Sequence, residues 1–263
     1  MTLNEKEIKN QGLVHYQSIR HHTPVMPPTY LYPSMDYDDA YAIANDIVKR
    51  YQLDGFTIAG KKVGLTSQAM RNCGGIYEPD YGFIFNETCY PNETTLNMSD
   101  FVQPGVEAEI AFKLKADLIG ENISPDDVLR ATEYIVLCLE IVDVRQKLDI
   151  PRKIFDSIAD NASYGAFIIG DTPVMPYTID LGLIGYVYEH NNHQTEVSCG
   201  AAVLDHPANA VAWLANKFYR LGTPLKAGEF VLSGSAITLQ MAQPGDNFRC
   251  RYGKLGEVSV NFV

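Results

Sequence analysis

Hydrophobic residues follow helical spacing in three stretches of this chain. Between residues 36 and 51 their spacing predicts an amphipathic helix, which Asp36 is placed to cap. Ser124-Pro125 predicts a second helix start, because proline is favoured at the first helical position and acidic residues follow it. A third helix is predicted over 207–222. The first 35 residues are polar and contain several prolines, which predicts an irregular arm with a helix at its very start.

The rest of the chain has strand composition. Residues 56–100 are predicted to form short strands and loops rich in glycine and aromatic residues. The second half is mostly β, and its predicted strands share β-branched and aromatic residues between glycine, proline or asparagine turns. They are 163–170, a hairpin over 183–202 that turns at Asn191-Asn192, 229–233, 236–241, 246–252 and 257–263. The coarse picture is an α+β protein, in which a small helix-containing part precedes a large mixed-β domain.

Two strands carry acidic residues among apolar ones. In the run 106–112, Glu107 and Glu109 point to the same face of a strand, with side chains roughly 5–7 Å apart. Glu140 lies inside a second apolar run, 135–142. A carboxylate buried in such a strand is unfavourable by several kcal/mol unless a cation pairs with it. Three carboxylates that converge from two strands would form an all-oxygen site for a hard divalent ion.

A simpler interpretation of the first pair stays open. Most glutamates at alternate positions form the solvated face of an edge strand, and Glu107 and Glu109 fit that description equally well. Glu140 favours the metal site, because its apolar neighbours leave it no obvious access to solvent.

Composition and charge exclude several function classes. The chain has 263 residues, 46% of them hydrophobic and 20% charged, which is typical of a globular protein with an ample core. A net charge of −11 without a basic cluster argues against nucleic-acid binding. The five cysteines are scattered and form no C-x-x-C pair, which favours a reducing compartment and neither disulfides nor zinc. No run of about 18 apolar residues and no signal core is present, so we expect no membrane span and a cytoplasmic location.

Other motifs are weaker when taken singly. The segment 60–67, GKKVGLTS, lacks the order of a phosphate-binding loop and is more simply a strand and turn, from which Lys62 would reach an acidic site. The segments 78–82 and 160–163 have the composition of turns. None of the six histidines lies between His22 and His190, so a serine–histidine–aspartate arrangement has no support. His206 is most simply a residue at the start of a helix.

Taken together, these motifs resemble one known family over nearly the whole chain from about residue 30 onward. The family is the 2-oxo-acid hydratase and decarboxylase branch of the fumarylacetoacetate hydrolase superfamily, and the nearest likeness is to the hydratases of aromatic meta-cleavage pathways. The matching motifs occur in the family's order: "GKKVGLTS", "EPDYG", "VEAEIAF", "LEIVDVR", "ADNAS" and "HPANAVAWLANK".

The resemblance implies a set of roles for individual residues. Glu107, Glu109 and Glu140 would hold Mg²⁺ or Mn²⁺. Other residues would face the substrate, a 2-oxo or 2-hydroxy dienoate: Lys62, Asp80 and Ser163 as catalytic residues, and Gly64, Leu65 and Arg145 as binding residues. The implied fold is a β-roll or barrel-like mixed sheet, with 1–100 as an α/β portion and arm and 101–263 as the catalytic domain. The family usually forms homo-oligomers, and some members associate with a pathway partner enzyme.

Several alternatives remain open at this stage. A 4-oxalocrotonate decarboxylase would use the same metal site, so the site residues do not separate it from a hydratase. A C–C hydrolase of the superfamily would need a lid histidine, for which only His21 and His22 are candidates. A non-catalytic binding or assembly subunit should have lost Lys62 or Asp80, and this chain has both. The segments 145–152 and 235–239 depart from the family pattern, which leaves the length and distal charge of the substrate open; Arg71, Arg145 and Arg152 are candidate partners for a distal carboxylate.

Overall fold

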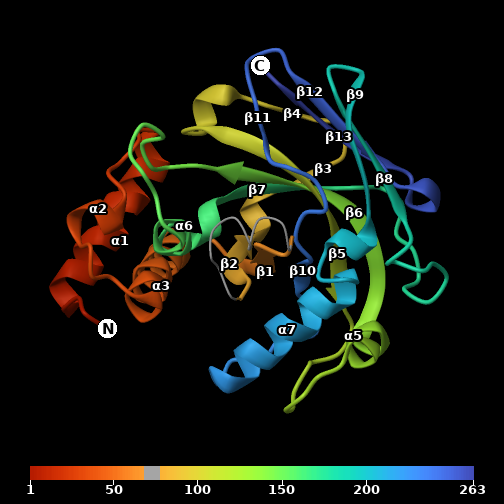
Figure 1. The fold of residues 1–263 in the computed structure, drawn as a ribbon, viewed down its shortest axis with the longest axis horizontal. Coiled ribbons are helices and arrows are strands. Elements are labelled where there is room, and N and C mark those ends of the chain that lie inside the picture. Colours follow the sequence, from red (N-terminus) through yellow and green to blue (C-terminus); the bar gives the residue numbers. More distant parts are fainter. Residues whose placement is uncertain (68–77) are drawn as a thin grey trace.

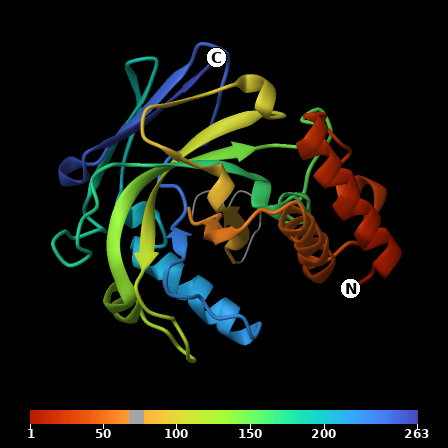
Figure 2. The ribbon, with the colours of Figure 1, turned by 180° about the vertical axis from the view of Figure 1, so that it is seen from behind.

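The computed structural model describes residues 1–67 and 78–263, and it arranges them as two sheets with helices packed on either side. Figures 1 and 2 show the large sheet curled into a half-barrel, with the N-terminal helices at one side and the second sheet at the other. The helices are α1 (Glu5–His21), α2 (Pro28–Leu31), α3 (Tyr37–Leu53), α5 (Pro125–Ala131), α6 (Ile154–Ala159) and α7 (Pro207–Arg220).

Eight strands form the large sheet, and they come from both sides of residue 100. Its order is β2-β1-β10-β5-β6-β7-β3, with β11 paired to β5 beyond the end of β10. The strands are β1 (Ile58–Gly64), β2 (Asp80–Phe85), β3 (Cys89–Pro91), β5 (Pro104–Leu114), β6 (Thr132–Asp143), β7 (Tyr164–Ile169), β10 (Phe230–Leu232) and β11 (Gln240–Met241). The division into portions at residue 100 stays a prediction.

The smaller sheet has five strands in the order β4-β13-β12-β8-β9. They are β4 (Thr94–Leu96), β8 (Gly185–His190), β9 (His193–Cys199), β12 (Asn247–Arg251) and β13 (Glu257–Phe262). The hairpin of β8 and β9 turns at Asn191-Asn192, where both residues have positive φ, as asparagine tolerates in a two-residue turn. This turn was predicted from the sequence and is confirmed.

Each face of the large sheet is covered by a separate hydrophobic core. On one face, side chains such as Val106, Ala108 and Ile110 pack with α7 and with the smaller sheet. On the other face, the helices α1, α3 and α6 pack over β1, β2 and the middle of the sheet, and Ile43, Val136 and Phe167 belong to that core. The acidic side chains of β5 and β6 lie on this second face. The sheet therefore carries polar residues in a region that helices and neighbouring strands shield from water.

The helix predictions are confirmed, whereas one strand prediction and one turn prediction need correction. Asp36 caps α3 by accepting a hydrogen bond from the backbone of Asp39, and the side chain of His206 caps α7. The predicted strand 236–241 is reduced to Gln240–Met241, because Ser235 Oγ bonds the backbone of Ile237 in place of a strand partner. The predicted turn at 78–82 is wrong from residue 80 onward, where the chain is already strand β2 and pairs with β1.

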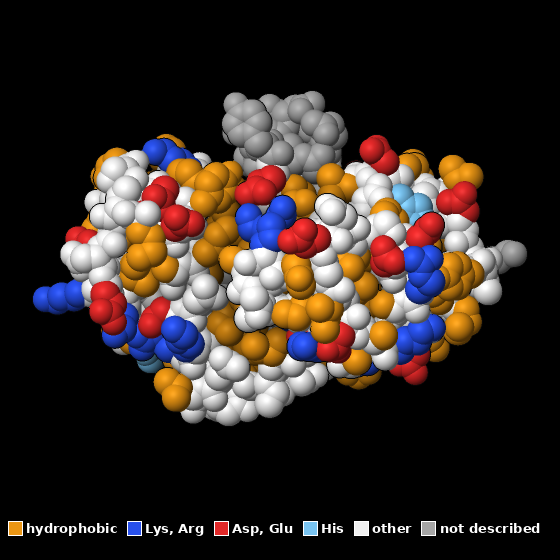
Figure 3. Space-filling view, turned by 90° about the horizontal axis from the view of Figure 1, so that it is seen from below, with side chains coloured by type: hydrophobic (Ala, Val, Ile, Leu, Met, Phe, Trp, Pro, Cys, Tyr) orange, Lys and Arg blue, Asp and Glu red, His pale blue; other side chains and the backbone are white. Residues whose placement is uncertain are grey.

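On the face shown in Figure 3, basic and acidic side chains are interspersed with hydrophobic ones and form no single basic patch. In the described part of the chain, no helix is both long and apolar enough to cross a membrane.

A strained turn joins α6 to β7. The three consecutive residues Asn161, Ala162 and Ser163 all have φ between 52° and 55°, the left-handed region that only glycine and asparagine adopt readily. Asn161 holds this turn against β2: its side chain accepts a hydrogen bond from Phe83 N and donates one to Phe83 O, both at 2.8 Å. The turn therefore depends on one buried amide that completes the edge of the sheet.

Replacing Asn161 with alanine should lower the free energy of unfolding by about 2 kcal/mol more than the same change at Asn122, because two buried hydrogen bonds are lost. Asn122 is the matched control: it also has positive φ, but it is exposed and its side chain bonds no described residue. Urea unfolding of the two variants measures the difference. Equal destabilisation would show that Asn161 contributes only its backbone conformation.

Candidate active site and metal centre

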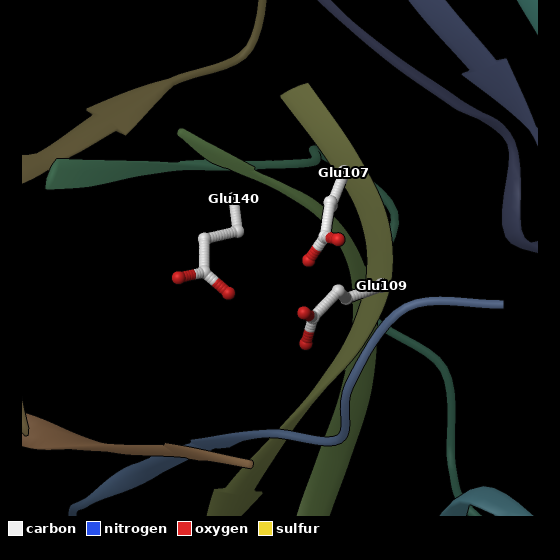
Figure 4. Close-up of side chains that lie close together, drawn as sticks. All are labelled: Glu107, Glu109 and Glu140. Carbon is white, nitrogen blue, oxygen red and sulfur yellow. The ribbon is translucent and has the colours of Figure 1, made fainter. Parts of the chain in front are cut away.

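Strand pairing brings the three glutamates together. In the antiparallel register of β5 and β6, Glu107 lies directly opposite Glu140, and Glu109 is two positions along on the same face. One oxygen from each carboxylate lies within 4.8 Å of the others. Figure 4 shows the three side chains pointing toward one another, Glu107 and Glu109 from one strand and Glu140 from its neighbour.

Two members of the cluster are fully buried, and the third, Glu107, is half-buried where it lines the cavity. Glu109 and Glu140 have no solvent-exposed surface, and β5 lies between β10 and β6 rather than at an edge of the sheet. The alternative in which Glu107 and Glu109 form the solvated face of an edge strand is therefore excluded. Buried carboxylates of this number require a compensating positive charge.

Protein groups compensate only part of that charge. Lys62 Nζ lies 3.0 Å from Glu140 Oε1, and the backbone amide of Gly234 donates to Glu109 Oε2 at 2.7 Å. Glu109 Oε1 and Glu140 Oε2 accept no hydrogen bond from any described residue. Converging, unsatisfied carboxylate oxygens are the donor set that Mg²⁺, Mn²⁺ and Ca²⁺ prefer. These residues fit a divalent ion.

The pKa values reflect the same crowding of charge. Burial, followed by repulsion from Glu140, raises the pKa of Glu107 to about 7 and raises that of Glu109 well above its ordinary value. Burial lowers the pKa of Lys62, but the surrounding carboxylates outweigh this and raise it overall, so the ammonium stays charged. Burial also raises the pKa of Asp80, which favours its protonated form.

A cavity of about 430 Å³ opens beside this cluster. It is within the size range of small-ligand sites, and five of the predicted catalytic and substrate-binding residues line it together with one predicted metal ligand. They are Lys62, Gly64, Leu65, Asp80 and Ser163, with Glu107. The structure thus brings the predicted residues of β1, β2 and the 161–163 turn to a single space.

Glycine at position 64 is required by the approach of Asp80. The two residues are paired across β1 and β2, and a Cβ added to Gly64 would lie 2.0 Å from Asp80 Oδ1. Any larger residue would displace the carboxylate. Leu65, the next residue, has a positive φ of 57°, so the backbone turns away from the sheet at this point. Ser163 reaches the cavity through the strained turn described above.

Arg145 does not line this cavity, contrary to its predicted place in substrate binding. It is buried, its Nε lies 2.6 Å from Asp160 Oδ1, and its two terminal nitrogens donate to the backbone oxygens of Tyr164 and Asp160. All of its donor nitrogens are engaged, so it acts as a structural cation behind the 161–163 turn. Arg71 lies outside the described residues, and Arg152 lines the cavity.

The histidines proposed for a C–C hydrolase lie elsewhere. His21 and His22 are exposed at the end of α1, and His22 lines a separate cavity with Arg145. No histidine is among the described residues that line the cavity beside the three glutamates. The described structure gives the hydrolase alternative no support.

Two contributions were missed at the sequence level. Gly234 supplies its amide to Glu109 from a backbone with φ of 92°, and a glycine directly after a strand was the only available signal. Lys153 lines the cavity beside Arg152, but its role depends on how the segment before α6 folds back over the sheet. Spacing along the chain does not contain that information.

Curated proteins with similar sequences span almost the full length. A 2-keto-4-pentenoate hydratase of Paraburkholderia xenovorans (strain LB400) is 39% identical over 262 residues, covering 100% of this chain and 96% of the relative. A 2-oxo-hept-4-ene-1,7-dioate hydratase of Escherichia coli is 38% identical, covering 88% and 89%. A 4-oxalocrotonate decarboxylase of Pseudomonas putida is 37% identical and covers 88% of each chain. A comparison with models of protein families finds no match.

Solved structures give the same grouping. The 4-oxalocrotonate decarboxylase of Pseudomonas putida G7, complexed with magnesium and adipate, has a TM-score of 0.95 and 32% identity, covering 100% of this chain and 99% of that one. Fumarylpyruvate hydrolase of Pseudomonas aeruginosa, in complex with Mn²⁺ and pyruvate, has a TM-score of 0.59 at 15% identity, covering 79% and 91%, and shares the fold alone.

Metal binding by this cluster should release protons. Because the pKa values of Glu107 and Glu109 are raised, the metal-free site holds protons near pH 7, and a divalent ion must displace them. The affinity for Mn²⁺ should therefore fall as the pH is lowered from 8 to 6, roughly tenfold per pH unit for each proton displaced. Titration calorimetry in two buffers of different ionisation enthalpy counts those protons. An affinity that does not change with pH would contradict the raised pKa values of the two glutamates.

Proposed function

Because this chain belongs to the hydratase and decarboxylase branch of the fumarylacetoacetate hydrolase superfamily, we propose that it is a divalent-metal-dependent hydratase. Its substrate is a 2-hydroxy-2,4-dienoate or the corresponding 2-oxo-4-enoate, and its product is a 4-hydroxy-2-oxo acid. The observation that carries the proposal is the buried cluster of Glu107, Glu109 and Glu140 beside a cavity lined by Lys62 and Asp80.

The three glutamates hold the ion, which we propose to be Mg²⁺ or Mn²⁺, the ions that accompany two related structures. When bound, a divalent ion supplies Lewis-acid polarisation of the substrate's C1 carboxylate and C2 oxygen. The rest of the chemistry falls to the protein. Lys62 stays charged at the edge of the cluster and stabilises negative charge that develops on the C2 oxygen.

Asp80 is the proton carrier. Its raised pKa lets the buried carboxylic acid give a proton to C5 of the dienol, while the enol hydroxyl gives its proton to bulk water, leaving a ketone conjugated with the C3–C4 double bond. Its carboxylate then takes a proton from water as the water oxygen bonds to C4, and that proton passes to C3. A proton from bulk water then restores the acid form of Asp80. Ser163, held at the cavity wall, orients the attacking water.

Decarboxylation of 4-oxalocrotonate is the second candidate. The decarboxylase of Pseudomonas putida G7 matches the whole chain with a TM-score of 0.95, and the same polarisation of the C2 oxygen would stabilise the charge left by departing CO₂. The homo-oligomeric state, the association with a pathway partner enzyme and the cytoplasmic location stay predictions from the sequence.

Replacing Glu107 with glutamine should reduce Mg²⁺-dependent hydration on the order of a hundredfold or more, because one anionic ligand is lost from the site. Glu133→Gln is the matched control, since Glu133 is an exposed residue on β6, the strand of Glu140. The assay follows the ultraviolet absorbance of a 2-hydroxydienoate together with released CO₂, with and without chelator, and circular dichroism confirms folding.

The outcomes separate the candidates. Loss of conjugation without CO₂, abolished by chelator, supports the hydratase. Stoichiometric CO₂ from 2-oxohex-3-enedioate, without hydration of the dienoate, would replace it with the decarboxylase. Full activity in Glu107→Gln would contradict the metal site itself.

A further inference from the structure

Two kinds of positive charge line the catalytic cavity. Lys62 lies in its buried part, against the glutamates, whereas Arg152 and Lys153 are exposed and line the same cavity from the segment that precedes α6. No other lysine or arginine is among the described residues that line it. The cavity is therefore cationic at its open side, in a chain whose net charge is −11.

These two exposed cations have no acidic partner in the described structure. No carboxylate of a described residue lies within 4.0 Å of the side-chain nitrogens of Arg152 or Lys153. The other cations near the site are engaged: Arg145 pairs with Asp160, Lys61 with Glu229, and Lys62 with Glu140. The positive charge at the cavity mouth is thus available to an anionic ligand.

The backbone that carries them is well anchored. Lys153 N donates to Asp156 Oδ2 at 2.7 Å, and the buried Asp156 also accepts from Thr29 N at 2.8 Å and from Thr29 Oγ1 at 2.7 Å. Helix α6 then leads directly to the turn that presents Ser163. The cationic pair and Ser163 therefore belong to one short segment that is anchored by hydrogen bonds at Lys153 and Asp156.

The buried part of the cavity offers no place for a second carboxylate. Three glutamates surround Lys62 there, so their charge would balance that of Lys62 and a divalent ion and leave no excess positive charge for another anion. Much of the remaining lining is apolar, with Val142, Val144, Ile154, Ile237 and Leu239. An apolar wall suits the hydrocarbon of a substrate, and only the mouth suits another anion.

We propose that the substrate carries a second carboxylate at its far end, and that Arg152, assisted by Lys153, binds it. The inference rests on the proposed hydratase function and specifies its substrate class: an α,ω-dioate of the heptadienedioate type rather than a simple pentadienoate. The planar guanidinium of Arg152 matches a carboxylate with two parallel hydrogen bonds, and Lys153 adds attraction for the incoming dianion.

The test compares two substrates and two variants in the presence of Mg²⁺. Wild-type protein should hydrate 2-hydroxyhepta-2,4-diene-1,7-dioate with a kcat/KM roughly tenfold above that for 2-hydroxypenta-2,4-dienoate. Arg152→Gln should remove that advantage through KM and leave the monoacid unchanged. Arg130→Gln is the matched control, because Arg130 is an exposed arginine on α5 outside the cavity lining, and it should change neither substrate.

A binding measurement separates failure of this inference from failure of the hydratase. In the presence of Mn²⁺, adipate should bind roughly tenfold more tightly than pentanoate, and Arg152→Gln should equalise the two. Hydration of both substrates at equal efficiency, unaffected by Arg152→Gln, would overturn the distal site and leave the hydratase intact. If neither substrate is turned over but adipate still binds more tightly than pentanoate through Arg152, the distal site is kept and the hydratase is overturned. Equal binding of both acids without turnover would overturn both.

Discussion

The burial of several carboxylates against one another is the constraint on which this structure depends. Glu107, Glu109 and Glu140 would repel one another in a low-dielectric interior, and only Lys62 and one backbone amide offset their charge within the described protein. Such an arrangement persists when an ion completes it, so the free energy of metal binding and the stability of the folded chain are linked. The register of β5 and β6 is what holds the three groups in place.

The proposed catalytic groups are placed by backbone features rather than by flexible side chains. Gly64 lets β1 and β2 come close enough for Asp80 to face Lys62, and a left-handed turn held by Asn161 presents Ser163 from the opposite side. Arg145, buried with Asp160, supports that turn from behind. Strain of this kind is unfavourable by about 1–3 kcal/mol per residue, and it is retained where the surrounding packing determines the conformation.

Local pattern was sufficient for much of the fold and for choosing Glu107, Glu109 and Glu140 as candidate metal ligands. Alternation in a strand predicts that Glu107 and Glu109 share a face, and the apolar run around Glu140 predicts its burial. Spacing along the chain does not reveal contacts between distant segments. Only the order of the strands in the sheet gives the pairing of Glu107 with Glu140, the hydrogen bond from Gly234 N to Glu109 and the position of Lys153. Arg145 was misplaced for the same reason, because its buried partner Asp160 lies on another element. Residues 236–239 were predicted as strand because the hydrogen bonds by which the Ser235 side chain caps the turn leave no hydrophobic or polar pattern in the sequence.

The most direct test is the position of the ion itself. A crystal soaked with Mn²⁺ and measured at the manganese absorption edge should give one anomalous peak per chain, within bonding distance, roughly 2.0–2.3 Å, of oxygens from Glu107, Glu109 and Glu140. That result would establish the three-glutamate centre on which the chemistry rests. A fully occupied manganese peak elsewhere, with none between the three carboxylates, would contradict it.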